Sequence, residues 1–73
     1  QSYINTPNLL IGSTNTPDSS SILDLESTTK GFLPPRVTTA ERDLISTPAE
    51  GLVVYNINTK NLDYYDGTAW GGV

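Results

Sequence analysis

The chain has 73 residues, a net charge of −4 and neither cysteine nor histidine, which allows one small domain and excludes disulfides. The same absence argues against a structural zinc site, and four basic residues give no electrostatic footprint for nucleic acid or an anionic membrane surface. No apolar run is long enough to span a membrane.

A domain of this size is expected to depend on a partner for its stability. The free energy gained by burying apolar surface is about as large as the conformational entropy lost when the chain is ordered. Small domains therefore use disulfides, metals or oligomerisation, and only oligomerisation remains for this composition. We expect the chain to fold with copies of itself.

Two short strands are predicted near the N-terminus, at residues 8–13 (NLLIGS) and 21–26 (SILDLE). The segment between them is rich in turn formers, so we expect an antiparallel hairpin. Its expected pairs are Ile11 with Leu23 and Leu9 with Leu25. Asp24 then lies on the more solvent-exposed face of this hairpin. Gly12 inside the first run predicts a bulge or a close backbone approach.

The next segment contains Pro34 and Pro35, which force an extended stretch that donates no ladder hydrogen bonds. Phe32 and Leu33 lie at this bend. A small protomer has little surface with which to cover both side chains, which indicates a subunit interface. The alternative is that they plug the end of the protomer's own core.

A capping box predicts a short helix over residues 39–45, because the Thr38 hydroxyl can accept from the Glu41 amide while the Glu41 carboxylate reaches back. The expected apolar face consists of Val37, Ala40 and Leu44, with Ile45 beside them. A helix of this length is marginal alone, so we expect it to be docked.

The strongest prediction is a β-hairpin over residues 52–66, which are rich in β-branched and aromatic residues, with its turn at 58–61. The expected cross-strand pairs are Ile57 with Leu62, Tyr55 with Tyr64, and Val54 with Tyr65. Asp66 and Gly67 then form a turn, after which Trp70 returns as a short strand or covers the sheet edge. The final residues 71–73 are expected to be flexible or to lead into another module.

No catalytic motif is present, and the paired carboxylates are not arranged for catalysis. Glu41 and Asp43 face different ways on a helix, and Asp63 and Asp66 point to opposite sides of a strand. These groups are expected to be solvated surface charges, and no EF-hand spacing supports calcium binding. The two arginines, Arg36 and Arg42, are expected to pair with acids at the surface or between subunits. We expect no enzyme activity, no cofactor and no metal site.

Several motifs occur together: TTKGFLPPR at 28–36, TTAER at 38–42, PAEGLVVYNINT at 48–59 and YYDGTAW at 64–70. In this combination the chain resembles a module of phage tail fibres and of bacterial surface or secreted proteins, notably of the Bacteroidetes. The N-terminal NLLIGSTNTP is similar to repeats of trimeric β-fibres. The resemblance implies a trimeric, β-rich structural or adhesive module without catalytic residues.

We therefore predict a mainly β fold of short antiparallel hairpins with one short α-helix, assembled as an intertwined homotrimer. The chain is expected to be one module, 1–73, in which 8–36 form the N-terminal hairpin and Pro-Pro bend and 37–73 the helix and C-terminal hairpin. The candidate subunit interface comprises Phe32, Leu33, Val53, Tyr55, Ile57, Leu62 and Tyr64.

The predicted function is structural, in the shaft or tip of a trimeric tail fibre or extracellular adhesin, with attachment to a host surface as a further role. The expected location is the virion or the cell surface. Expected partners are copies of the chain, flanking fibre modules and a glycan or protein receptor. Neither nucleic acid nor membrane insertion is expected.

The alternative is a carbohydrate-binding tip in which Tyr65 and Trp70 stack on a glycan. In the structural interpretation the same two rings pack at a subunit seam, because small β-domains need their large side chains for the core.

Overall fold

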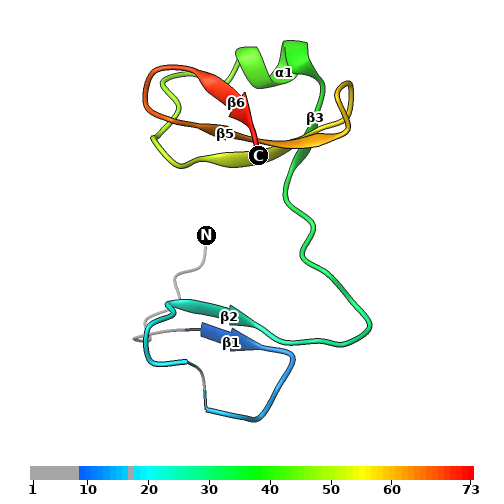
Figure 1. Cartoon of the computed structure of the whole chain (residues 1–73), viewed down its shortest axis with the longest axis vertical. Helices are drawn as coiled ribbons and strands as arrows, with labels where there is room; N and C mark the ends of the chain where they lie inside the picture. The colour runs from blue at the N-terminus through cyan, green and yellow to red at the C-terminus, as the bar shows by residue number, and fades with distance from the viewer. Residues whose placement is uncertain (1–8, 17) are drawn as a thin grey trace. The chain divides into compact units, whose positions relative to one another are not determined.

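The computed structural model describes residues 9–16 and 18–73, and the chain divides into two compact units, Gln1–Phe32 and Leu33–Val73. Each unit has its own sheet (Figure 1). The first unit contains the strands β1 (Leu9–Ile11) and β2 (Leu23–Leu25). The second contains β3 (Arg36–Val37), α1 (Thr39–Asp43), β4 (Val53–Asn56), β5 (Asn61–Tyr65) and β6 (Trp70–Gly72). Within the described residues no helix has the length and apolar character needed to cross a membrane.

The strands of the first unit are parallel, so the predicted antiparallel hairpin is wrong. The observed register pairs Leu9 with Leu23, Leu10 with Asp24 and Ile11 with Leu25. A hairpin reverses the chain within its turn, whereas here the chain returns to the end at which β1 starts before β2 begins. The predicted assignment of side chains to the two faces of the sheet is nevertheless correct. Residues two apart on a strand share a face whether the strands are parallel or antiparallel. Asn8, which was included in the first predicted strand, lies outside the described residues.

Gly12 makes the close backbone approach that its place in the first strand run predicts. Its φ is +96°, and a Cβ at this position would collide with the carbonyl oxygen of Glu26. The two segments are held together there, since the Glu26 amide donates to the Ile11 carbonyl over 2.9 Å. Only glycine combines the positive φ with the absent side chain.

The second unit is a four-stranded sheet in the order β3-β4-β5-β6, in which β3 runs parallel to β4 and the other neighbours are antiparallel. Pro34 and Pro35 precede the edge strand β3, so their missing amide hydrogens interrupt no ladder of the sheet. Pro35 accepts through its carbonyl from the Tyr55 amide over 2.8 Å. The predicted return strand exists as β6, and Gly71 and Gly72 belong to it, pairing with Tyr64 and Asp63.

The hairpin of β4 and β5 is confirmed, but its register is two residues from the predicted one. The observed pairs are Val53 with Tyr64, Val54 with Asp63, Tyr55 with Leu62 and Asn56 with Asn61. The loop therefore has four residues, 57–60, and ends at Lys60 with φ of +59°. A two-residue turn at Thr59-Lys60 would favour glycine or asparagine, because these residues adopt a positive φ readily. The four-residue loop instead places the positive φ at Lys60. A shift of two leaves every side chain on its predicted face.

The capping box of α1 is confirmed: the Thr38 hydroxyl accepts from the Glu41 amide at 3.1 Å and the Glu41 carboxylate accepts from the Thr38 amide at 2.8 Å. The helix is shorter than predicted, and its expected apolar face is not buried. Ala40 is exposed and Leu44 is 82% exposed, whereas Val37 and Ile45 are half-buried. The helix instead docks through Thr39 and Arg42, because the sheet residues that receive it are polar.

Candidate functional site

One face of the β4–β5 hairpin is apolar and uncovered, and we call it the outer face. It consists of Val53, Tyr55, Leu62 and Tyr64, which form two directly opposed cross-strand pairs. Val53, Leu62 and Tyr64 are each 40–41% exposed, and Tyr55 is half-buried. The structure thus brings four of the predicted interface residues together on one surface.

The other three predicted interface residues lie beyond this patch, and all are exposed. Ile57 directly follows β4, and its amide donates to the Val37 carbonyl over 2.9 Å. Phe32 is the last residue of the first unit and Leu33 the first of the second. Neither belongs to a strand, so the sheet does not position them.

The opposite face of the hairpin, the inner face, carries a polar core instead of an apolar one. Val54 is buried, and beside it Asn56 is fully buried and Asp63 is 4% exposed. The Asn56 side chain donates to Asp63 Oδ2 and to Thr39 Oγ1, both at 3.0 Å. Its Oδ1 accepts from the amides of Asn58 at 2.9 Å and Thr59 at 3.3 Å, which shapes the hairpin loop.

Arg42 completes this core from the helix. Its Nη1 donates to Asp63 Oδ2 over 2.8 Å, while Nε and Nη2 donate to Asp43 Oδ1. The prediction that Asp63 is a solvated surface charge is therefore wrong, and the expected pairing of Arg42 is found within the chain. Among the described residues, every buried side-chain nitrogen and oxygen has a hydrogen-bond partner.

The environment of Asp63 favours its ionised form. The hydrogen bond from Asn56 lowers the pKa of Asp63 most, and Arg42 lowers it further against the opposing effect of burial. Sequence reasoning missed this centre because acids on a short hairpin are usually solvated. One sequence signal did point to a buried Asp63. Asp63 shares a face of the hairpin with Tyr65 and, on the neighbouring strand, with Val54. A carboxylate on such a face needs a cationic partner.

The two predicted glycan-contact residues lie together on the inner side of the sheet. Tyr65 and Trp70 are paired across β5 and β6, with ring centroids 5.4 Å apart in an edge-to-face arrangement. The Arg42 guanidinium carbon lies 5.5 Å from the Trp70 ring centroid, a cation–π contact. Both rings are half-buried, and Trp70 contacts the arginine that completes the polar core.

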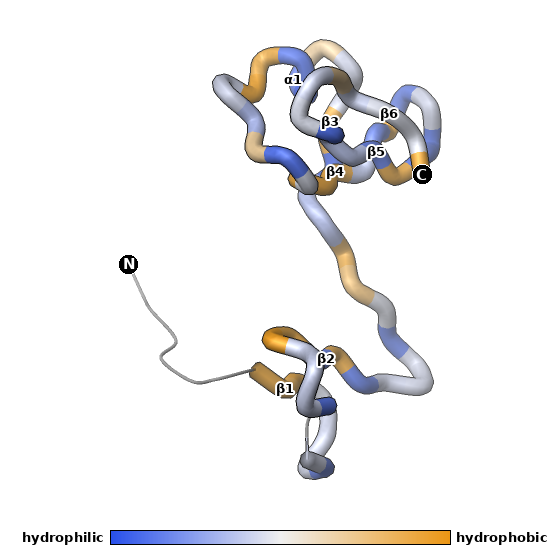
Figure 2. Tube along the Cα trace, turned by 60° about the vertical axis from the view of Figure 1, so that its left-hand side comes forward, coloured by the Kyte–Doolittle hydropathy of each residue, from blue (hydrophilic) through white to orange (hydrophobic). Residues whose placement is uncertain are grey.

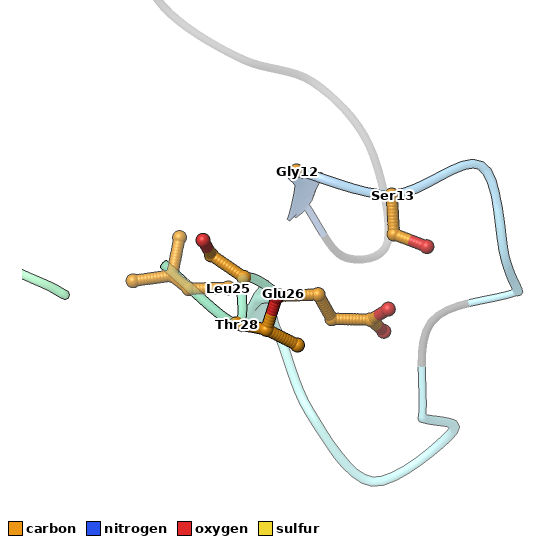
Figure 3. A pocket seen from close by; sticks show the side chains of 6 residues that line it. Gly12, Ser13, Leu25, Glu26 and Thr28 are labelled. Atoms are coloured by element: carbon orange, nitrogen blue, oxygen red, sulfur yellow. The ribbon is translucent and has the colours of Figure 1, made fainter. Parts of the chain in front are cut away.

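No three acidic side chains in the part of the chain that the structure describes lie close enough together to hold a metal ion. Asp66 caps its own turn, accepting from the amides of Thr68 and Ala69 at 2.8 Å, which lowers its pKa. An open depression in the first unit is lined by Gly12, Ser13, Leu25, Glu26, Ser27 and Thr28 (Figure 3). Its lining contains a single carboxylate, that of Glu26.

Comparison with protein families identifies a match over most of the chain. The model of a family described as a phage tail like trimerisation region matches residues 10–73, which include the helix and every strand except the first residue of β1. No curated protein and no solved structure matches the chain.

Proposed function

The chain belongs to the phage-tail-like trimerisation family, and from this premise we propose that the outer face is the surface through which three copies associate. The role is structural: the module holds the subunits of a tail fibre in a trimer. No turnover of a substrate is part of this role, and the protein acts by its contacts.

The observation that carries this proposal is the contrast between the two faces of one hairpin. The inner face is covered by α1 and has its buried polar atoms satisfied, so it needs nothing further. The outer face presents Val53, Tyr55, Leu62 and Tyr64 without any element of the second unit over it. An ordered apolar patch on a small protein marks an interaction site, and the family supplies the partner, which is another copy.

The aromatic and aliphatic composition of the outer face suits a permanent contact. The patch contains two tyrosines and no charged side chain, as in the cores of subunit interfaces. Because the patch lies on paired strands, its side chains are positioned before assembly, which reduces the entropy lost on association.

The test compares Leu62→Asp with Leu44→Asp, the same substitution on two exposed leucines of the second unit. Leu62 lies on the outer face, whereas Leu44 follows α1. Light scattering should show Leu62→Asp as a single chain at concentrations where the native protein is trimeric, and Leu44→Asp as a trimer. Circular dichroism checks that both variants fold. A trimeric, folded Leu62→Asp protein would contradict the proposal.

Glycan binding by Tyr65 and Trp70 remains a separate prediction. A stacking platform needs an open ring face, whereas Trp70 has the Arg42 guanidinium over its ring and makes an edge-to-face contact with Tyr65. The native trimer on a glycan array tests it: binding that disappears in a folded Trp70→Phe trimer supports the contact, and silence of the native protein opposes it.

A further inference from the structure

A second apolar surface lies in the first unit, and we call it the strand-pair face. In the parallel register of β1 and β2, directly opposed residues point to the same side. One side of the pair therefore carries four aliphatic side chains, namely Leu9, Ile11, Leu23 and Leu25. The other side carries Leu10 and Asp24. The hydropathy colouring shows the apolar stretches along both strands (Figure 2).

The strand-pair face is too exposed to be the core of its unit. Ile11, Leu23 and Leu25 are each between 44 and 53% exposed. A sheet of two strands is marginally stable in water and needs a further layer against its apolar side. The first unit has its own hydrogen-bonded organisation, including the Gly12–Glu26 contact, but its aliphatic side chains lack the burial that would stabilise it.

We propose that the strand-pair face is a second trimer contact, in which the equivalent faces of three copies meet at the three-fold axis. This inference rests on the proposed trimer and goes beyond the outer face. The family match covers residues 10–73 and so includes nearly all of β1 and the whole of β2. A closed three-fold ring presents the same surface of every copy to its axis, which lets each face cover the others.

Charge selects which side of the strand pair turns inward. Asp24 lies on the opposite side, where its carboxylate accepts from the Asp18 amide over 3.1 Å. No ion pair in the described part of the chain involves Asp24. Three copies of this carboxylate at an axis would therefore repel one another, and this side is expected to face solvent. The chain carries a net charge of −4, which makes such an arrangement still less favourable.

The absence of cysteine allows a direct test, because an introduced thiol is the only one in the chain. Leu23→Cys places it on the strand-pair face, and Leu10→Cys places it on the opposite side of the same sheet. Both full-length variants are oxidised mildly as trimers and analysed on a denaturing gel. We expect at least about tenfold faster formation of covalent dimers from Leu23→Cys, since a disulfide requires Cα atoms within about 7 Å. Measurable dimer formation at equal rates in the two variants would overturn the proposal.

A second pair of variants covers the case in which the geometry does not allow a disulfide. Leu25→Asn should raise the concentration at which the trimer dissociates by at least about tenfold, whereas Leu10→Asn should change it little. Unchanged dissociation of Leu25→Asn would overturn this inference while leaving the outer face untouched. A native protein that is monomeric would instead contradict the proposed function itself, so the two failures are distinguishable.

Discussion

Arg42 and Asp63 join the helix to the centre of the second sheet, with Nη1 of Arg42 2.8 Å from Oδ2 of Asp63. The Asp63 side chain is 5% exposed and that of Arg42 is 18% exposed. This pair takes the place of an apolar contact between α1 and the sheet. It lets a module with very little buried apolar surface keep a defined inner face while its apolar side chains point outward.

Asp63→Asn should lower the free energy of unfolding by about 3 kcal/mol, because it leaves the partly buried Arg42 without its buried counter-ion. Asp43→Asn is the matched control. Asp43 also binds Arg42, but its side chain is 56% exposed, so the loss should be below about 1 kcal/mol. Urea unfolding followed by Trp70 fluorescence at fixed chain concentration measures both. Equal losses would show that the buried pair has no special role.

Acid should remove the contribution of Asp63 to stability. Its pKa is lower in the folded chain than in the unfolded one, so this contribution is fully present above the ordinary aspartate value of 3.8 and is lost as the pH falls through the folded value. The difference in unfolding free energy between the native protein and Asp63→Asn should therefore narrow below pH 3.8. Thermal unfolding of both proteins between neutral and strongly acidic pH measures this difference, and a constant difference would contradict the assignment.

Asn56→Ala should cost about 2–3 kcal/mol, because it removes the donor to Asp63 and the acceptor for the loop amides of Asn58 and Thr59. Asn61→Ala is the control: Asn61 is the cross-strand partner of Asn56 but is exposed. Its replacement should change stability by less than about 0.5 kcal/mol. Chemical denaturation of the two variants distinguishes them, and comparable losses would argue against the buried amide as the organising residue.

Gly12→Ala should loosen the first unit, since the new Cβ would meet the Glu26 carbonyl at a backbone φ of +96°. Gly31→Ala should be close to neutral, because nothing lies within 4 Å of a Cβ there. Hydrogen exchange at the Glu26 amide, which donates to Ile11, reports the effect directly. Protection of this amide that is the same in both variants would contradict the close approach.

The sequence predicted which side chains share a face better than it predicted which strands run together. Leu9, Ile11, Leu23 and Leu25 share a face as expected although β2 runs parallel to β1, because face depends only on the alternation of side chains. Strand direction depends on the path of residues 12–22, which no local propensity determines. The hairpin register likewise depended on loop length, and that length follows from the Asn56 side chain bound to the loop amides.

The polar core was not predictable from local patterns, because its members lie on three different elements. Thr39 and Arg42 come from α1, Asn56 from β4 and Asp63 from β5. The capping box located the start of the helix, yet the face that the helix buries depends on the sheet beneath it. The outer face was more accessible to sequence reasoning, since alternation alone groups Val53 with Tyr55 and Leu62 with Tyr64.

Sedimentation equilibrium of the native chain across a wide concentration range distinguishes a trimer from a monomer without any substitution. We expect a folded species with three times the 7.9 kDa mass of the chain, which dissociates only on dilution. A folded protein with the mass of a single chain at every concentration would contradict it.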